Sequence, residues 1–378
     1  MKVLYITHYN ELYGANKSML YLIEDMKSRY NIEPIVLCPG DGNLINELNR
    51  MSVKYYKVKN YRWMTGGKNN IIYNYIKRIL NKVVLYQKAY FIIRKLNIDI
   101  VHSNSSVISI GNYLAKRLEI PHIWHLREFG ESDYDLKYIY NLKRVRKIFE
   151  QSDCLIAISS AIEEYYKKLA PNANIKLIYN GINNSDYLKI AVQDVEKINF
   201  CCVGLINSNK NQMEIIKAVN YLVKKNISGF VVNIIGDGEK KYINNINDYI
   251  NKNNLERYVK FWGYRNDVKE ILPKMQIGII PSRNEAFGRV TVEYMMNGLP
   301  VIGSNAGGTT EIIKNNETGF LYPLGMIEEL ANCMEKYILN KELREKHAKQ
   351  AIIDSNNRFS MKANTDFIYS IYQKLIRS

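Results

Sequence analysis

Short apolar runs alternate with longer stretches of helical periodicity along most of the chain. Each run in the first half has the length of one buried strand, and the longest helical patterns there span Lys17–Arg29 and Ile71–Leu96. Strands that alternate with helices predict a mostly parallel sheet covered on both faces. The expected strands are Val3–Thr7, Pro34–Cys38, Val53–Val58, Ile98–His102, His122–Leu126, Cys154–Ile158 and Ile175–Tyr179.

The same alternation restarts near Ile198, after the polar segment Asn180–Asp194, and everything from about Glu328 is helical. A chain of 378 residues also exceeds the roughly 250–300 residues at which single cores stop growing. We therefore predict an α/β protein with two Rossmann-like, doubly wound domains that face each other across a cleft. The strands expected in the second domain are Asn199–Leu205, Phe230–Ile235, Tyr258–Trp262, Ile277–Pro281 and Pro300–Gly303.

Composition and charge narrow the function classes. Hydrophobic residues make up 47% and charged residues 24%, which is typical of globular proteins and excludes a disordered chain. The five cysteines contain no Cys-x-x-Cys pair, which favours a reducing compartment over a disulfide or metal framework. Without a visible signal peptide or membrane span, we expect a cytoplasmic protein, either free or bound peripherally to the inner face of the cell membrane.

The net charge of +16 is concentrated in one region. Residues 51–98 contain 11 basic side chains and no acidic one. Such a bias suggests an anionic partner, which can be nucleic acid, anionic lipid or a phosphorylated substrate. Apolar residues recur at helical spacing within this region, so two interpretations stay open: a core helix with a solvated basic face, or a helix that docks on an anionic membrane.

Three histidines lie at or just after the ends of expected strands. His8, His102 and His125 would therefore converge on the edge where open α/β sheets bind ligands. Turn or capping roles are equally open for each of them. His122 and His125 do not form a convincing metal pair, because side chains three apart on a strand point to opposite faces.

The most informative segment runs from Pro281 to Glu311. An expected strand ends at Pro281, a loop follows, and a helix is predicted from about Arg289 to Gly298. Free backbone N–H groups and the positive dipole end make that helix start a place for a phosphate. Glu285 in the loop and Glu293 one turn inside the helix can both face one pocket.

Glu285 and Glu293 stand in the pattern S-x-x-E-x-F-G-x-V-x-x-E-x-M-x-x-G-x-P-V-I, followed by Gly307-Gly308 and Glu311. This pattern resembles the donor-site signature of the retaining, family-4 nucleotide-sugar glycosyltransferases of GT-B fold (glycosyl transferases group 1). The resemblance covers nearly the whole chain. Further segments that match in order are Met1–Thr7 with Tyr13-Gly14-Ala15, Ile178–Ile182, Val203-Gly204 with Lys210-Asn211-Gln212, Ile235–Gly238 and Val259 to Gly263.

The resemblance implies two domain roles and a set of site residues. Residues 1–182 would form the acceptor-side domain, with a helix at about 360–378 packed back on it, and residues 183–359 would bind the donor. Catalytic roles are implied for Glu285 at the transferred sugar, Lys210 at the diphosphate and His125 beside the reaction centre. Donor binding is implied for Glu293 at the ribose and for Gly14, which would let the first loop approach the phosphates. The N–H groups of Phe287, Gly288 and Arg289 would contact the sugar, and those of Val290 and Thr291 the phosphate. The stretch Phe261–Arg265, with Gly263 and Tyr264, would contact the base.

One position departs from the family pattern. Many members carry an arginine directly after the glycine equivalent to Gly204, and here that residue is Leu205. Arg283 or Arg289 are candidates to replace its charge. On the other domain, Arg127 and Glu128 follow His125 and either meet the acceptor or pair with each other.

The activity implied by the resemblance is sugar transfer with retention, from a UDP-sugar or GDP-sugar to a sugar or lipid-linked glycan, in bacterial surface polysaccharide or glycolipid synthesis. No metal and no cofactor beyond the nucleotide-sugar are implied. Two alternatives stay open: an epimerase or hydrolase of nucleotide-sugars with the same fold, and a basic nucleic-acid-binding protein. No RRM or KH motif supports the nucleic-acid alternative.

Overall fold

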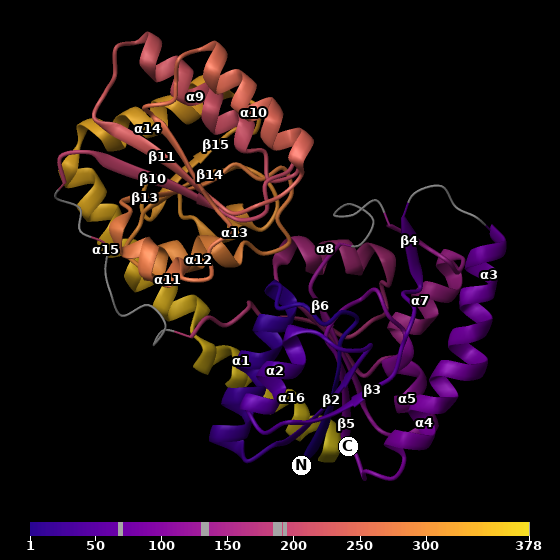
Figure 1. Ribbon diagram of the computed structural model, residues 1–378. Helices are drawn as coiled ribbons and strands as arrows, with labels where there is room; N and C mark the ends of the chain where they lie inside the picture. Colours follow the sequence, from indigo (N-terminus) through magenta and orange to yellow (C-terminus); the bar gives the residue numbers. More distant parts are fainter. Residues whose placement is uncertain (67–70, 130–135, 184–190, 192–194, 378) are drawn as a thin grey trace. The chain divides into compact units, whose positions relative to one another are not determined.

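The computed structural model describes residues 1–66, 71–129, 136–183, 191 and 195–377. Contacts between residues divide the chain into two compact units. Unit 1 comprises Met1–Gly181 and Met361–Ser378, and unit 2 comprises Ile182–Ser360. Each unit has one main parallel sheet with helices, as the alternating pattern predicts (Figure 1).

Unit 1 is built on a seven-stranded sheet with the order β3-β2-β1-β5-β6-β8-β9, and its paired strands run parallel. Its central strands are apolar and buried on both faces, as expected for a sheet that helices cover. The strands are β1 (Lys2–Ile6), β2 (Glu33–Cys38), β3 (Lys54–Lys57), β5 (Ile100–Ser103), β6 (His122–Leu126), β8 (Cys154–Ala157) and β9 (Ile175–Leu177). The helices are α1 (Gly14–Tyr30), α2 (Asn43–Arg50), α3 (Ile71–Ile79), α4 (Tyr86–Ile93), α5 (Ile110–Leu118), α7 (Leu142–Glu150), α8 (Ser160–Leu169) and α16 (Met361–Arg377).

Unit 2 contains a six-stranded parallel sheet with the order β12-β11-β10-β13-β14-β15. In Figure 1, α9, α10 and α14 lie over one side of this sheet and α12 and α13 over the other. The strands are β10 (Ile198–Val203), β11 (Phe230–Ile235), β12 (Val259–Gly263), β13 (Ile277–Ile280), β14 (Val301–Ser304) and β15 (Gly319–Tyr322). The helices are α9 (Gln212–Lys224), α10 (Lys240–Lys252), α11 (Val268–Ile271), α12 (Arg289–Met296), α13 (Thr309–Ile312), α14 (Ile327–Leu339) and α15 (Lys341–Phe359).

The last helix returns to unit 1 and completes its core. Tyr369 of α16 stacks on Tyr30 of α1 with ring centroids 3.7 Å apart, and the Tyr30 hydroxyl donates to Asp366 at 2.6 Å. Ile368 and Tyr372 are fully buried and belong to the same apolar cluster as β1. The amphipathic pattern of the C-terminal segment therefore supplies one side of the first sheet's core.

The structure differs from the sequence prediction in three places. The helix expected over Ile71–Leu96 ends at Ile93 and is interrupted by a π-helix at Leu80–Leu85, with α3 before it and α4 after it. Strand β15 was not predicted, because it begins at Gly319 and glycine is a poor strand former. A Cβ at Gly319 would come within 2.0 Å of the Val301 carbonyl oxygen, so close strand packing, not β propensity, selects this glycine.

The third difference is the antiparallel pair β4 (Met64–Gly66) and β7 (Leu136–Tyr138), which is too short to leave a periodic signal. Among the described residues, no helix combines the length and the apolarity needed to cross a membrane.

Candidate functional site

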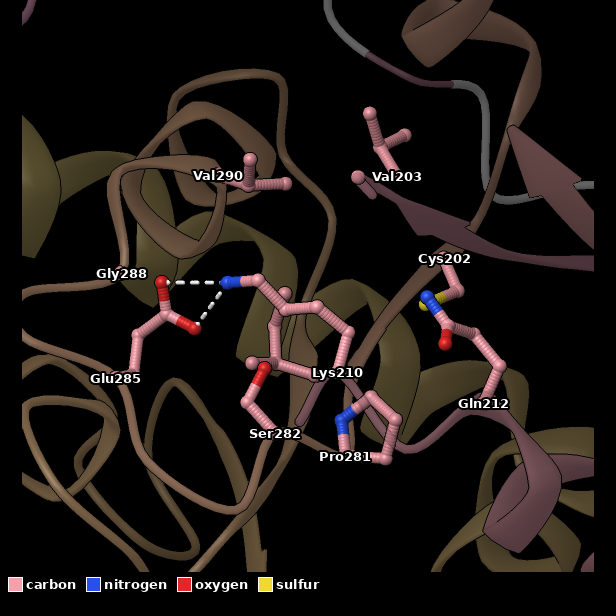
Figure 2. Close-up of a pocket in the computed structure, with 11 residues that line it drawn as sticks. Cys202, Val203, Lys210, Gln212, Pro281, Ser282, Glu285, Gly288 and Val290 are labelled. Atoms are coloured by element: carbon pink, nitrogen blue, oxygen red, sulfur yellow. Dashed lines mark hydrogen bonds and ion pairs between the residues drawn. The ribbon is translucent and has the colours of Figure 1, made fainter. Parts of the chain in front are cut away.

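A cavity of about 50 Å³ lies at the carboxyl ends of β10 and β13 in unit 2, where parallel sheets place their ligand sites. Figure 2 shows that its walls come from the end of β10, the start of α9 and the loop that leads into α12. Burial raises the pKa of the Cys202 thiol in its wall to about 12, so this thiol stays protonated. The lining residues are Cys202, Val203, Gly204, Lys210, Gln212, Ile280, Pro281, Ser282, Glu285, Gly288 and Val290.

Lys210 and Glu285 meet in this cavity. The Lys210 Nζ atom lies 2.6 Å from Glu285 Oε2 and 2.9 Å from Oε1, so the ammonium bridges both carboxylate oxygens (Figure 2). The Glu285 side chain is 16% exposed and that of Lys210 is 32% exposed. Asn207 fixes the Lys210 backbone by accepting its N–H at 2.9 Å. Two residues 75 positions apart thus form one partly shielded ion pair.

Two glycines hold the Glu285 loop in place. The Gly308 N–H donates to the Glu285 carbonyl oxygen at 2.6 Å. A Cβ at Gly307 would lie 2.6 Å from the same oxygen, and one at Gly308 would lie 2.7 Å from the Phe287 carbonyl oxygen. Only glycine fits this close approach of two backbone segments, which explains the Gly307-Gly308 pair beside the acidic loop.

Helix α12 begins directly after the loop. Gly288 caps it in the left-handed region with φ of 94°, a conformation that favours glycine. The Val290 residue in its first turn lines the cavity, whereas Phe287 is buried and the Thr291 N–H donates to the Gly288 carbonyl at 2.9 Å. The positive end of the helix dipole therefore points toward the cavity that holds Lys210.

Glu293 lies one turn into α12 and forms an ion pair of its own. Arg289 Nε donates to Glu293 Oε1 at 2.9 Å, and both side chains are about 15% exposed. Glu293 is not among the residues that line the cavity of Glu285. The sequence interpretation assigned Arg289 a backbone role and proposed its side chain as a substitute cation. In the structure, that side chain engages Glu293.

The other candidate cation is Arg283. Its Nε donates to the Ser208 carbonyl oxygen at 3.2 Å and its guanidinium also contacts Asn211, so it braces the loop around Lys210. Leu205, at the position where the family pattern has arginine, is 56% exposed.

The segment expected to bind the base ends β12. Gly263 has φ of 67° and its carbonyl accepts from Gly236 at 2.9 Å. Tyr264 follows and is 78% exposed, and Trp262 Nε1 donates to Asn233 at 2.9 Å. The structure thus places Gly263 and Tyr264 at the same edge of the sheet as the end of β10, with the Tyr264 ring open to a ligand.

The predicted residues of unit 1 lie at the carboxyl end of its sheet. His125, in β6, is buried beside His102, with 3.1 Å between His102 Nε2 and His125 Nδ1. The predicted convergence of histidines thus holds for this pair. His8 instead packs against Tyr9, and burial together with the Arg62 charge lowers its pKa to about 3.

Arg127 and Glu128 are both buried and use different partners. Arg127 donates to Asn104 and to Asn180, each at 2.7 Å. Glu128 Oε1 accepts from the hydroxyls of Ser105 and Ser106 at 2.8 and 2.7 Å. Burial raises the pKa of Glu128, and these donors and Arg127 oppose that rise.

Gly14 opens α1, and a Cβ there would meet no atom within 4 Å, so the space above the helix start is open.

Sequence reasoning missed the residues that support these groups. Asn104 and the two serines are small polar residues with no distinguishing motif, and Asn180 lies in the matched segment Ile178–Ile182, where no role was assigned to it. Tyr372, which contacts His102, lies 270 positions away in the chain. The only sequence signal of Asn104, Ser105 and Ser106 is their place just after strand β5, at the edge where ligands bind.

Two family models match the chain almost end to end. The model described as Glycosyltransferase Family 4 matches residues 13–186, and the model described as Glycosyl transferases group 1 matches residues 185–354. The chain belongs to the family 4 glycosyltransferases. Its ion-paired Lys210 and Glu285 lie within the part matched by the group 1 model.

Curated relatives and solved structures resemble this glycosyltransferase over most of its length. It is 25% identical over 311 residues to the N-acetyl-alpha-D-glucosaminyl L-malate synthase of Bacillus anthracis, covering 78% of this chain and 80% of the relative. It is 27% identical over 322 residues to the UDP-Gal:alpha-D-GlcNAc-diphosphoundecaprenol alpha-1,3-galactosyltransferase of Escherichia coli, covering 80% and 81%. The crystal structure of Anabaena Alr3699/HepE in complex with UDP superposes with a TM-score of 0.84 at 20% identity, covering 99% and 100%. The glycosyltransferase therefore has the GT-B fold with two Rossmann-like domains.

Proposed function

We propose that this glycosyltransferase moves a sugar from a UDP-sugar to a glycan or lipid-linked glycan, with retention of the anomeric configuration. The observation that carries the proposal is the unit 2 cavity, in which Lys210, Glu285 and the start of α12 meet. A cation and a helix dipole aimed at one point suit a diphosphate leaving group. Uridine as the base is supported by the Anabaena structures with UDP and with UDP-glucose. GDP-sugars are the second candidate donors.

Within this proposal, unit 2 binds the donor. Lys210 and the N–H groups at the start of α12 stabilise the negative charge that grows on the diphosphate as the sugar–phosphate bond breaks. The acceptor hydroxyl oxygen bonds to the anomeric carbon on the face of the sugar from which the diphosphate leaves. The hydroxyl proton passes to the departing phosphate oxygen. Glu285 contacts the transferred sugar, and Glu293 leaves Arg289 to accept hydrogen bonds from the ribose hydroxyls. Gly263 and Tyr264 meet the base.

Unit 1 takes the acceptor side. His125 lies beside the reaction centre, Gly14 lets the first loop approach the phosphates, and Arg127 with Glu128 shapes the acceptor site. No divalent metal is needed, because Lys210 and the helix dipole already offset the charge of the leaving group. The proposed domain ranges are 1–182 with about 360–378, and 183–359.

A transfer assay with labelled donors tests the reaction. UDP- and GDP-sugars are incubated with lipid-linked and free glycan acceptors, with and without EDTA. Product that forms only with acceptor, persists in EDTA and keeps the anomeric configuration by NMR is the expected result. Conversion of the donor without acceptor would instead indicate an epimerase or a hydrolase. A strict metal requirement would refute the proposed charge stabilisation.

We also propose that the enzyme works in the cytoplasm on the inner face of an anionic membrane, where it meets a lipid-linked acceptor. The supporting feature is the rod formed by α3, the π-helix and α4, on the outside of unit 1 (Figure 1). Asn81 holds the rod to unit 1 through bonds to the backbone of Tyr61 at 2.8 and 2.9 Å. Tyr86, Ala89 and Ile93 of the rod are buried, whereas other apolar side chains along it are each 37–61% exposed: Tyr75, Ile76, Ile79, Leu80, Val83, Val84 and Phe91.

The basic charge of the rod indicates which partner its apolar surface binds. Lys82 and Lys88 are exposed on the same rod, and Arg94 and Lys95 follow it. Residues 51–98 contain no acid, so an anionic bilayer is complementary, whereas a protein partner would need an acidic face. Each basic residue near such a surface contributes about 1 kcal/mol. Of the basic residues in segment 54–95, Lys68 lies outside the described residues, as does the side chain of Arg78.

Vesicle co-sedimentation tests the surface. The wild type should bind vesicles of anionic lipid and not neutral ones, and added salt should weaken the binding. Lys82→Gln with Lys88→Gln, or Val83→Asn with Val84→Asn, should reduce it. The matched charge control is Lys240→Gln with Lys241→Gln, two exposed lysines of unit 2. Equal binding to both vesicle types, or equal effects of both lysine pairs, would contradict the proposal.

A further inference from the structure

A chain of buried polar side chains links α16 to the carboxyl end of the unit 1 sheet. The Tyr372 hydroxyl lies 2.6 Å from His102 Nδ1 and 3.2 Å from the Tyr5 hydroxyl. His102 Nε2 lies 3.1 Å from His125 Nδ1. Tyr5, His102 and Tyr372 are fully buried and His125 is 1% exposed, so water does not compete for these bonds.

Arg127 fixes which atoms donate and which accept in this series of hydrogen bonds. Its Nη2 lies 3.3 Å from His125 Nδ1. A guanidinium can only donate, so His125 Nδ1 must accept, and His125 carries its proton on Nε2. The same guanidinium is locked by its bonds to Asn104 and Asn180, which keep it from turning away.

The states of the next two groups follow from that of His125. Because His125 Nδ1 accepts, His102 Nε2 must donate to it, and His102 Nδ1 is then left as an acceptor. The Tyr372 hydroxyl shares its one proton between this nitrogen, at 2.6 Å, and the Tyr5 oxygen, at 3.2 Å, and the shorter contact receives most of it. Burial and the Arg127 charge lower the pKa of both histidines well below the ordinary value, which keeps the rings neutral.

The series of hydrogen bonds ends at the Nε2 donor of His125. His125 Nε2 is buried and has no hydrogen-bond partner among the described residues. His125 is the second-to-last residue of β6, so this end of the ring lies at the edge where parallel sheets bind ligands. A buried N–H left unpaired costs free energy, unless a ligand supplies the acceptor.

We propose that His102 and Tyr372 are positioning residues that hold His125 as a neutral donor through Nε2, aimed at an oxygen of the bound sugar. This proposal rests on the proposed transfer function, which supplies the sugar. A neutral imidazole whose Nδ1 is already engaged, and whose Nε2 carries a proton, cannot accept the acceptor's proton. His125 therefore orients the sugar, and the proton leaves with the phosphate oxygen.

Variants of His102 separate positioning from packing. His102→Phe keeps the ring volume but loses both hydrogen bonds, and should lower kcat/KM for transfer about tenfold, the loss expected for one misplaced donor. His102→Gln can still donate to His125 and accept from Tyr372, so it should retain most of the activity. Tyr372→Phe should lower kcat/KM several-fold, whereas Tyr86→Phe, which removes a buried hydroxyl bonded to Ser109 at 3.1 Å, should not. Activity retained by Phe and lost by Gln would overturn the proposal.

Nitrogen-15 NMR of histidine-labelled protein tests the same state without any substrate. The His125 signals, assigned by their loss in His125→Gln, should show a protonated Nε2 and an unprotonated Nδ1. His102→Phe should broaden or mix these signals. A protonated Nδ1 in the wild type would overturn the proposal. If the NMR result is as expected and no transfer is detected with any donor, the proposed function fails while the hydrogen-bond chain stands.

Discussion

Replacing Glu285 with glutamine should tighten the binding of UDP while it slows sugar transfer. The Lys210 ammonium pairs with the Glu285 carboxylate, at 2.6 and 2.9 Å. A diphosphate that binds Lys210 must displace this carboxylate, and the carboxylate also repels it. Glu285→Gln removes both obstacles and keeps the shape of the side chain.

The size of the effect follows from the exposure of the pair. Lys210 is 32% exposed, so solvent screens the pair and its strength is near the upper end for surface pairs, about 1 kcal/mol. Recovering that energy on binding corresponds to about a fivefold lower Kd for UDP. Transfer should nevertheless fall by about tenfold or more, because glutamine does not place a full negative charge at the reacting sugar.

Isothermal titration calorimetry of UDP against wild type and Glu285→Gln measures the first effect, and turnover with the UDP-sugar measures the second. The affinity gain should shrink at high salt. Glu335→Gln is the matched control, because it breaks the Lys225–Glu335 pair of the same length, 2.6 Å, elsewhere in unit 2. Weaker UDP binding by Glu285→Gln would refute the displacement reasoning.

Three further predictions concern other groups. Lys210→Ala should weaken UDP binding about tenfold and lower turnover while uridine affinity stays the same, because a charge-assisted bond to the diphosphate is lost; equal losses for uridine and UDP by calorimetry would make Lys210 structural. Glu293→Ala should weaken nucleotide-sugar binding at least tenfold, since two charged hydrogen bonds are worth roughly 1.5–3 kcal/mol each; an unchanged Kd in a folded variant would contradict this. Unit 1 should lose stability below about pH 6.5, because burial lowers the pKa of its histidines and the unfolded chain then binds more protons. At pH 5.5 the free energy of unfolding should fall by about 1.4 kcal/mol per histidine. Urea denaturation of Trp262→Phe, followed by tryptophan fluorescence, measures this loss, because the remaining tryptophans lie in unit 1. A free energy of unfolding that does not change with pH would oppose the prediction. These histidines are His8, His102, His122 and His125.

The fold was largely readable from the sequence because buried parallel strands are continuous apolar runs. The run His122–Leu126 is strand β6 without any change of bounds, and Phe230–Ile235 is likewise β11. Elements that owe their form to tertiary packing were not readable. Gly319 begins a strand because it packs against the Val301 backbone, and the π-helix follows a run with ordinary helical periodicity.

The candidate site shows the same division. The family pattern identified Glu285 and Lys210 separately, but no pattern indicates that the two side chains form an ion pair with each other. Arg289 was expected to act through its backbone N–H or as a substitute cation, whereas its side chain pairs with Glu293. Tyr372 carries no motif at all, since it reaches His102 only once the C-terminal helix has folded against β1 and β5.

The return of α16 to unit 1 has a consequence for how the protein is made. Asn364 Nδ2 donates to the Tyr179 carbonyl oxygen at 2.6 Å, and Gly181 is a glycine because Met361 and Asn364 lie within 3 Å of where its Cβ would be. Residues 182–360 lie between these two contacts, so a ribosome delivers all of unit 2 before unit 1 receives its last helix. A nascent chain halted before residue 361 lacks the tyrosine that orients the buried histidines, and it also exposes the apolar faces of α1 and β1. Early release would yield a product open to chaperones or proteases, so the proposed activity requires that α16 has been synthesised.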